Sequence, residues 1–488
     1  MDVLVPSRPS VSPGPGVTPG IGVPRAAAVF IAAAGASLFL AIAATHVFNK
    51  DEIEHIHAAW LVSTGLAPYR DFFEHHHPLM WNLYAIVLPW LGQHGWVLLV
   101  FRAITFCQVA AIAVLTHRLA RATVGDRTAG LSLALLATMS AFGRDGLLIR
   151  PDTPQALCVV AAAFVLARSK LRSRDAGVAG TLLGLGFLFS LKALVTIAVI
   201  GPLLLAWLFR RRVGVPFLLA MAGACLAPIG LYLVYLIASG SFRDYYLANW
   251  LLNVDITAGQ RSASLTPGYA LWFNFPFWII GLGGAAWWLF RAGATPAQQV
   301  VAVNAIGTIA ILVALGRTEN RSILVAVPFV SIAAAAAFDA ILRWLRLSHW
   351  TSACVLVALT VTPVVDLTRW LPRTHRRQLE VVDFVLRETS GGDLVYDGNC
   401  SFNLFRRDPD YFWFHPTLGD HTLGKTAAAA RIRSALALRM SRTSYDACDL
   451  LRTTTPRIVF TVAADPVACG LEPRYERTPY QGMWRRRL

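Results

Sequence analysis

The sequence has few charged residues and few cysteines. Only 15% of its 488 residues are charged and seven are cysteines, whereas about 25% of the residues of a soluble domain are charged. The low charge excludes an ordinary soluble enzyme, and the few cysteines exclude a disulfide-rich scaffold. No internal repeat of about 20–50 residues is visible, so a solenoid is not expected. Hydrophobic residues make up 56% of the chain, which has a mean hydropathy of +0.52. This composition predicts a polytopic membrane protein.

Apolar runs occur throughout the first three quarters of the chain. A helix needs about 20 apolar residues to cross a membrane. About eleven runs approach that length, near residues 26–48, 95–117, 128–142, 153–167, 176–191, 193–209, 214–239, 269–290, 298–316, 322–342 and 348–366. A shorter run at 79–92 contains a proline and predicts an interfacial or re-entrant segment. We therefore expect a mainly α fold, a transmembrane helical bundle over residues 26–366.

The positions of the charges orient this bundle. Residues 1–25 are rich in Pro, Gly and Ser and predict a disordered tail. If this tail is cytoplasmic, most Lys and Arg residues of the membrane part fall on the cytoplasmic side, as the positive-inside rule requires. Most carboxylates of the membrane part then lie outside. The net charge of +16 is explained largely by topology, and no nucleic-acid partner is expected.

The composition changes after the last apolar run. Residues 367–488 contain no run of membrane length and carry many charges of both signs. Strand-like pieces at 394–396 and 457–462 alternate with helix-like stretches near 376–389 and 424–440, which predicts a small extracytoplasmic α/β domain. Its cysteines Cys400, Cys448 and Cys469 either include one disulfide or remain three buried thiols, and the spacing does not specify a pair.

The first outer loop, residues 49–78, is dense in acids, histidines and aromatic residues. Asp51 and Glu52 follow the first span directly, at the membrane surface. A carboxylate there can be partly desolvated, which raises its basicity and suits a general base. Alternatively, both residues cap the helix that follows, because acids are favourable at a helix N-terminus.

Four separated elements resemble glycosyltransferase family 39, whose members have the GT-C fold. The first element is the signature of the first loop, with Asp51-Glu52, Gly65-x-x-Pro68-Tyr69-x-Asp71-Phe72-Phe73 and His76-His77-Pro78-Leu79. The other three, further along the chain, are Arg102, Arg150-x-Asp152 and Lys192. The resemblance covers about residues 26–210 and extends to topology alone beyond them. It places the protein in a bacterial inner (plasma) membrane, with the N-terminus cytoplasmic and the C-terminal domain extracytoplasmic.

The resemblance implies an enzyme that moves a sugar from a polyprenyl-phosphate carrier to a lipid, glycan or protein acceptor on the outer face, with inversion. By this analogy Asp51 is the general base, and Glu52 orients the acceptor or shares that role. It also implies contacts of the acceptor or sugar with Asp152, Tyr69, Asp71, His76 and His77. No cofactor is required, and a divalent metal is possible but not expected.

Cations near the outer ends of the spans are candidates to bind the carrier phosphate. Arg102 and Lys192 lie in or at the ends of apolar runs, where a charge costs at least about 2.5–3.5 kcal/mol. A lipid phosphate would be a suitable partner, and the alternative is a structural ion pair with Asp152 or another outer acid. Further outer-side candidates are Arg150, Arg261, Arg317 and Arg321.

Two alternatives remain open. The histidines of the first loop suggest a metal site, but three consecutive histidines cannot all face one ion from a regular helix or strand. Hydrogen-bonding or interfacial roles are therefore expected for them. A transporter or flippase would also carry charges near its spans. Transporters usually have repeated halves, and no such symmetry is visible here, so the sequence favours an enzyme.

Overall fold

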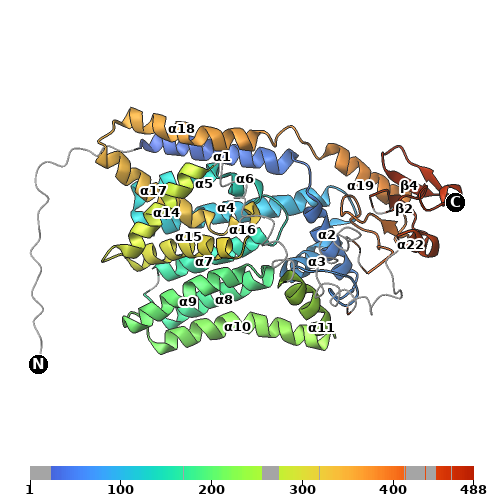
Figure 1. Ribbon diagram of the computed structural model, residues 1–488, viewed down its shortest axis with the longest axis horizontal. Coiled ribbons are helices and arrows are strands. Elements are labelled where there is room, and N and C mark those ends of the chain that lie inside the picture. Colours follow the sequence, from blue (N-terminus) through green and yellow to red (C-terminus); the bar gives the residue numbers. More distant parts are fainter. Residues whose placement is uncertain are drawn as a thin grey trace, which may run out of the picture.

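Long helices run side by side along the length of the molecule, and a small sheet lies beyond one end of them (Figure 1). The computed structural model describes residues 23–168, 170–254, 274–317, 319–411, 413, 435, 447–462 and 464–487. Most of the predicted N-terminal tail lies outside these ranges. The predicted fold class, a mainly α membrane protein with a small C-terminal sheet, is confirmed.

Each predicted apolar run overlaps one main helix of the bundle. These helices are α1 (Arg25–Thr45), α4 (Val97–Val124), α5 (Asp126–Thr138), α7 (Asp152–Arg168), α8 (Ser173–Phe189), α9 (Ala193–Phe209), α10 (Val215–Ala238), α14 (Phe275–Phe290), α15 (Pro296–Ala314), α17 (Val327–Trp344) and α18 (His349–Thr368). Among the described residues, six helices are long and apolar enough to cross a membrane, namely α1, α4, α10, α15, α17 and α18. The count of eleven spans stays a prediction.

Small residues allow two bundle helices to approach closely. On α8, Gly180 and Gly184 face the backbone of α10. A Cβ atom at Gly180 would lie 2.2 Å from the carbonyl oxygen of Met221, and one at Gly184 would lie 2.3 Å from that of Cys225. Glycines four residues apart lie on one face of a helix, the arrangement by which membrane helices pack at short distance. This contact joins α8 and α10 along much of their length.

The outer surface of the bundle is apolar. On α10, large side chains such as Leu219, Leu231 and Ile237 are exposed. Only 11% of the most apolar 18-residue stretch of this helix is buried inside the protein. A soluble protein rarely exposes such a continuous apolar face. Lipid is the environment that this face requires, because hydrocarbon solvates it without cost.

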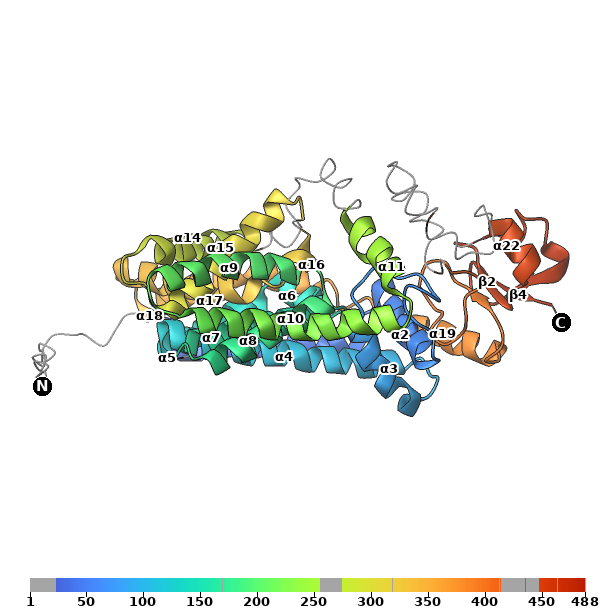
Figure 2. The same cartoon turned by 90° about the horizontal axis from the view of Figure 1, so that it is seen from below.

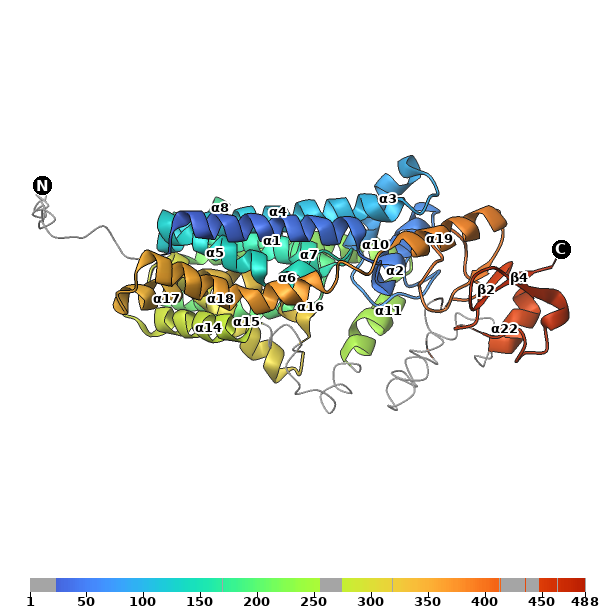
Figure 3. The same ribbon diagram turned by 90° about the horizontal axis from the view of Figure 1, so that it is seen from above.

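Shorter helices lie where the bundle meets the C-terminal region. They are α2 (Lys50–Ser63), α3 (Leu79–Leu91), α6 (Ser140–Arg144), α11 (Phe242–Tyr245), the π-helix Tyr246–Leu251 and α16 (Asn320–Ile323). Figures 2 and 3 show α2 between the bundle and the C-terminal sheet. The segment predicted as interfacial or re-entrant is α3, which is helical despite Pro89 and packs against α2. Its depth in the membrane stays a prediction.

The C-terminal region contains a four-stranded mixed sheet. It follows α19 (Arg376–Glu388) and has the strand order β1-β2-β4-β3, with β1 parallel to β2 and the other neighbours antiparallel. The strands are β1 (Val395–Tyr396), β2 (Ile458–Phe460), β3 (Tyr475–Arg477) and β4 (Met483–Arg486). Among the described residues of this region, the other helices are α22 (Ala447–Thr454) and the 3₁₀ turn Glu472–Arg474. The predicted helix at 424–440 lies outside the described residues, apart from residue 435.

The cysteines of this region resolve the alternatives that the sequence left open. Cys448 and Cys469 form a disulfide, which joins α22 to the loop before β3. Cys400 is a buried free thiol. The sheet region is tied to α2 by His57, whose Nε2 atom lies 2.7 Å from Asp408 Oδ2. These contacts fix the C-terminal region against the first outer loop.

Candidate active site

The site is built on the first turn of α2, which the sequence caps strongly. The side chain of Asn49 accepts a hydrogen bond from the backbone of Asp51, and the carboxylate of Glu52 accepts one from the backbone N–H of Asn49 at 2.8 Å. This capping box satisfies N–H groups that the helix itself leaves without partners. The predicted capping role is therefore confirmed for Glu52, while the side chain of Asp51 has other partners.

Glu52 forms a buried ion pair with Arg102 of α4. Arg102 Nη2 lies 2.5 Å from Glu52 Oε2, and Arg102 Nε donates to Glu52 Oε1 at 3.0 Å. Arg102 also donates to the carbonyl of His46 and packs on the ring of Phe48. Both charged side chains are buried. Of the two roles left open for Arg102, the structure contains the ion pair, with Glu52 and not with Asp152. Binding of a phosphate by Arg102 stays a prediction, which its buried hydrogen bonds inside the protein do not favour.

Asp51 lies in a separate cluster of five charged residues. Its carboxylate contacts Arg150 and lies 3.5 Å from Nη1 of Arg321. Arg150 Nε also donates to Asp152 Oδ2 at 3.1 Å, and Lys192 Nζ donates to Asp152 Oδ1 at 2.6 Å. Three cations and two carboxylates therefore form one connected network with a net positive charge.

Four distant segments of the chain contribute to this network. They are the start of α2, the loop and first residue of α7, the connection from α8 to α9, and α16. Asp152 is the first residue of α7, where the helix dipole favours a carboxylate. The sequence expectations for Asp51, Arg150, Asp152, Lys192 and Arg321 thus meet at one place in the structure.

The buried and exposed ends of the network differ. The side chains of Arg150 and Asp152 are almost fully buried, whereas Lys192 is 30% exposed and Arg321 is 44% exposed. Burial lowers the pKa of Lys192, against the opposing effect of Asp152. A second anion near Lys192 would stabilise its charged form. The accessible part of the network is therefore cationic.

Further charged residues lie near this network, and of these only Arg317 was a candidate from the sequence. Arg317 lies 3.0 Å from Glu319, and Arg144 lies 3.2 Å from Asp145. Burial raises the pKa of Asp145, and the charges of Arg144 and Arg321 oppose this. No sequence signal distinguished Arg144, Asp145 and Glu319 from other charges in outer loops.

The other first-loop residues predicted to contact the sugar or the acceptor stabilise the loop itself. Tyr69 is buried in a left-handed conformation, with φ of 67°, and its hydroxyl donates to the carbonyl of His76 at 2.6 Å. Asp71 accepts from the backbone of Ala67 at 2.7 Å. His77 is buried against Phe187, and burial lowers its pKa to about 3. Contact of Tyr69, Asp71 or His77 with a sugar or acceptor stays a prediction.

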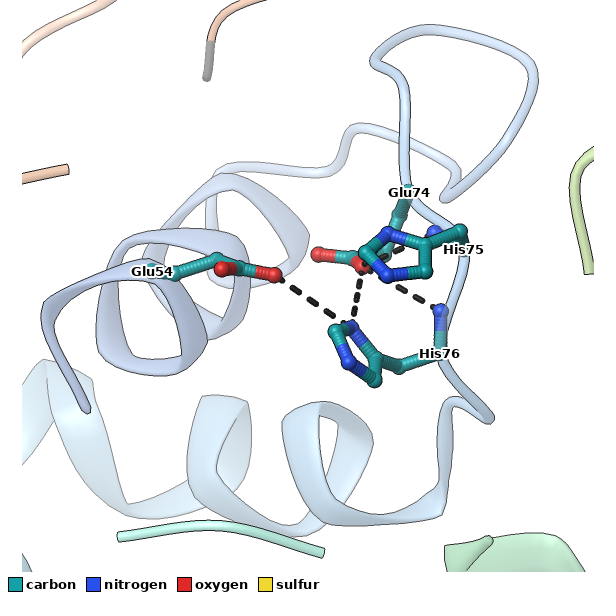
Figure 4. A group of neighbouring side chains, drawn as sticks. All are labelled: Glu54, Glu74, His75 and His76. Atoms are coloured by element: carbon teal, nitrogen blue, oxygen red, sulfur yellow. Dashed lines mark hydrogen bonds and ion pairs between the residues drawn. The ribbon is translucent and has the colours of Figure 1, made fainter. Parts of the chain in front are cut away.

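His76 belongs to a second cluster, apart from the five-residue network. Its Nδ1 atom lies 2.9 Å from Glu74 Oε1 and 3.3 Å from Glu54 Oε1 (Figure 4). Burial opposes protonation of His76, but hydrogen bonds to the two carboxylates outweigh it and raise its pKa to about 10. The remaining site candidate, Arg261, lies outside the described residues.

Comparisons with known proteins agree with this architecture. Residues 75–235 match a family model described as dolichyl-phosphate-mannose-protein mannosyltransferase. The crystal structure of ArnT from Cupriavidus metallidurans in the apo state superposes with a TM-score of 0.59 and 11% identity, over 88% of this chain and 92% of that chain. The chain has the GT-C fold. No curated protein matches the sequence.

Two further solved structures with this GT-C fold are similar at lower scores. ArnT from the same organism bound to undecaprenyl phosphate gives a TM-score of 0.47 and 16% identity, over 74% of this chain and 72% of that chain. The second structure is the oligosaccharyltransferase AglB from Archaeoglobus fulgidus, in complex with an inhibitory peptide and a dolichol-phosphate. It gives a TM-score of 0.47 and 13% identity, over 74% of this chain and 58% of that chain. The family model and the apo structure of ArnT confirm the predicted resemblance to GT-C membrane glycosyltransferases. The matched segment 75–235 contains Arg150, Asp152 and Lys192 and begins after Asp51.

Proposed function

We propose that this GT-C chain is an inverting membrane glycosyltransferase. It would move a sugar from a polyprenyl-phosphate carrier to an acceptor on the outer face of the bacterial plasma membrane. The observation that carries the proposal is the charged network at one end of the bundle, in which Asp51 lies beside more cations than carboxylates. Such a network provides the two elements that this transfer needs, a proton acceptor and a cationic site for a phosphate.

Lys192 and Arg321 are the proposed ligands of the carrier phosphate. They are the most exposed cations of the network, and each belongs to a connection at the end of the bundle, where a lipid headgroup would lie. A phosphate there would compete with Asp152 for Lys192 and with Asp51 for Arg321. The cations would then stabilise the charge that develops on the phosphate as the glycosidic bond breaks.

Asp51 is the proposed general base. Its side chain is only 15% exposed, so it is partly shielded from water, as a base acting on an acceptor hydroxyl requires. It forms ion pairs with Arg150 and Arg321. When a phosphate binds Arg321, Asp51 loses one of these partners and becomes a better proton acceptor. Binding of the donor would thereby prepare the base.

The choice of donor rests on the family and on the fold. The family description names a dolichyl-phosphate-linked mannose, and ArnT, whose apo structure superposes well on this chain, has also been crystallised with undecaprenyl phosphate. Both carriers present a phosphate on a long apolar chain. We therefore propose a polyprenyl-phosphate sugar as donor and a lipid, glycan or protein as acceptor, with no required cofactor.

A transporter or flippase of a lipid-linked substrate is the alternative. Transporters place their substrate sites near the bilayer midplane, on interrupted helices. The five charged residues described here lie at the ends of helices or in connections, which favours chemistry at a membrane surface.

The test is Asp51→Asn, with Glu380→Gln as the matched control. Glu380 is an exposed carboxylate of α19, far along the chain from the site. Purified chain in lipid nanodiscs is first tested for binding of undecaprenyl phosphate. Lipid-linked glycans are then profiled in cells that carry the wild type, either variant, or no copy of the gene.

Asp51→Asn should bind the carrier but lower transfer by at least about 100-fold, the contribution of a general base, while Glu380→Gln keeps wild-type activity. Lys192→Met should weaken carrier binding. Full transfer by Asp51→Asn would remove the proposed base. An unchanged glycan profile together with altered uptake of a solute would favour the transporter.

A further inference from the structure

Two buried glutamates and two histidines converge between α2 and the loop that precedes α3. Glu54 comes from α2, and Glu74, His75 and His76 come from the loop. Figure 4 shows the four side chains turned toward one another, with His76 beneath the two carboxylates. One ligand atom from each residue lies within 4.8 Å of all the others. None of the four belongs to the network around Asp51 and Asp152.

Among the described residues, the buried carboxylates of this cluster are only partly hydrogen-bonded. Glu74 is fully buried and Glu54 is 5% exposed, so two carboxylates lie out of water with His76 as their shared partner. The Oε1 atom of Glu74 accepts from the backbones of His75 and His76 and from the His76 ring. Its Oε2 atom is buried and accepts no hydrogen bond from the part of the chain that the structure describes. A buried oxygen without a partner costs free energy, and a cation beside it would remove that cost.

The ligand types suit a transition-metal dication. Carboxylate oxygens and imidazole nitrogens bind Zn²⁺ at about 2.0–2.2 Å, usually in a tetrahedron. Tetrahedral ligand atoms at that distance are about 3.5 Å apart, so the present separations of up to 4.8 Å need to contract by at most about 1.3 Å. Side-chain rotation can supply this, because His75 and His76 are partly exposed and come from a loop.

We propose that Glu54, Glu74, His75 and His76 form a zinc site that clamps the first outer loop to α2. The two buried carboxylates form its closed side, and the two partly exposed rings leave a path for the ion to enter. Metal binding would displace the proton that His76 now shares with the carboxylates. The zinc would hold α2, and with it Asp51, in place, since Glu54 lies three residues after Asp51 on the same helix. It goes beyond the proposed sugar transfer and does not depend on it.

The test measures metal content directly. Full-length chain in nanodiscs is stripped with a chelator, dialysed against micromolar zinc chloride, freed of loose metal and analysed by mass spectrometry of the metal. The wild type should hold one zinc per chain. Glu74→Gln and His76→Asn should fall to background, while His94→Gln, a change in an exposed histidine outside the cluster, should keep one zinc.

Two further measurements keep the proposal falsifiable if a buried variant does not fold. His75→Asn removes a partly exposed ligand and should weaken zinc binding at least about tenfold, the effect that changes outside the ligand shell already have. X-ray absorption of the zinc-loaded wild type should show imidazole scattering. The proposal is overturned if the wild type retains no zinc, if the zinc persists in Glu74→Gln, or if no imidazole is bound. Loss of sugar transfer with normal zinc content would affect only the proposed function.

Discussion

Neutralising Asp51 and neutralising its neighbour Glu52 should have different effects on stability and on sugar transfer. Glu52 accepts four hydrogen bonds, from the backbones of Asn49 and Ile149 and from two nitrogens of Arg102. In Glu52→Gln an amide NH₂ group replaces one acceptor oxygen, so that it faces N–H donors from which the carboxylate accepted hydrogen bonds. The positive charge of Arg102 stays buried without a counter-charge. Breaking a buried ion pair in this way costs about 3–5 kcal/mol.

That cost is a large part of the stability of a typical folded protein, which is about 5–15 kcal/mol. Glu52→Gln should therefore unfold at a clearly lower temperature than the wild type when tryptophan fluorescence is followed in nanodiscs. Replacing both partners, Glu52→Met with Arg102→Met, should restore part of the loss because no charge remains buried. Recovery should be incomplete, since the carbonyl of His46 then loses its donor, and an unsatisfied buried acceptor costs about 1–3 kcal/mol.

The comparison with Asp51→Asn makes this reasoning refutable. Asp51→Asn leaves Arg150 paired with Asp152, so it should unfold close to the wild-type temperature and lose transfer. Glu52→Gln should lose stability and keep measurable transfer per folded molecule at low temperature. If Glu52→Gln is as stable as the wild type, the buried pair is not what holds α2. If it is folded and fully inactive, Glu52 takes part in the chemistry.

Two further changes test the packing and the C-terminal region. Gly180→Ala places a methyl group 2.2 Å from the Met221 carbonyl oxygen and should cost about 1–3 kcal/mol by overpacking, measured as a lower unfolding temperature. Gly177→Ala, on the same helix with nothing within 4 Å, should be neutral or stabilising by up to about 1 kcal/mol. Cys448→Ser opens the disulfide to Cys469 and should destabilise the sheet region by about 3 kcal/mol, seen as faster proteolysis there. Cys400, which is buried, should react with maleimide only after unfolding. Fast labelling of Cys400 itself in the native chain would contradict its placement.

The helices of the bundle could be predicted because their signal is local. An apolar run of sufficient length requires a helix in lipid whatever it packs against. The short strands β3 and β4 gave no such signal, since three or four residues containing arginines do not alternate clearly between apolar and polar. Their pairing depends on contacts that only the folded chain provides.

The site was predictable only in part, and for a similar reason. A resemblance of spaced motifs indicated Asp51, Asp152 and Lys192, which the structure brings into one network. It did not indicate that Arg102 pairs with Glu52, fifty positions away, because such pairing follows from how α2 docks on α4. Glu54 and Glu74 were missed altogether, since charged residues in an outer loop ordinarily face water.

The order of the acids on α2 explains how one short helix can serve three partners. Successive residues of an α-helix point about 100° apart, so Asp51, Glu52 and Glu54 leave the helix in three different directions. Glu52 is held by Arg102, and in our proposal Glu54 is held by a zinc ion. Two anchors on different sides resist rotation of the helix and so keep Asp51 directed toward the cations. Loss of either anchor should therefore displace the base without removing it, and its effect on transfer should remain smaller than that of Asp51→Asn.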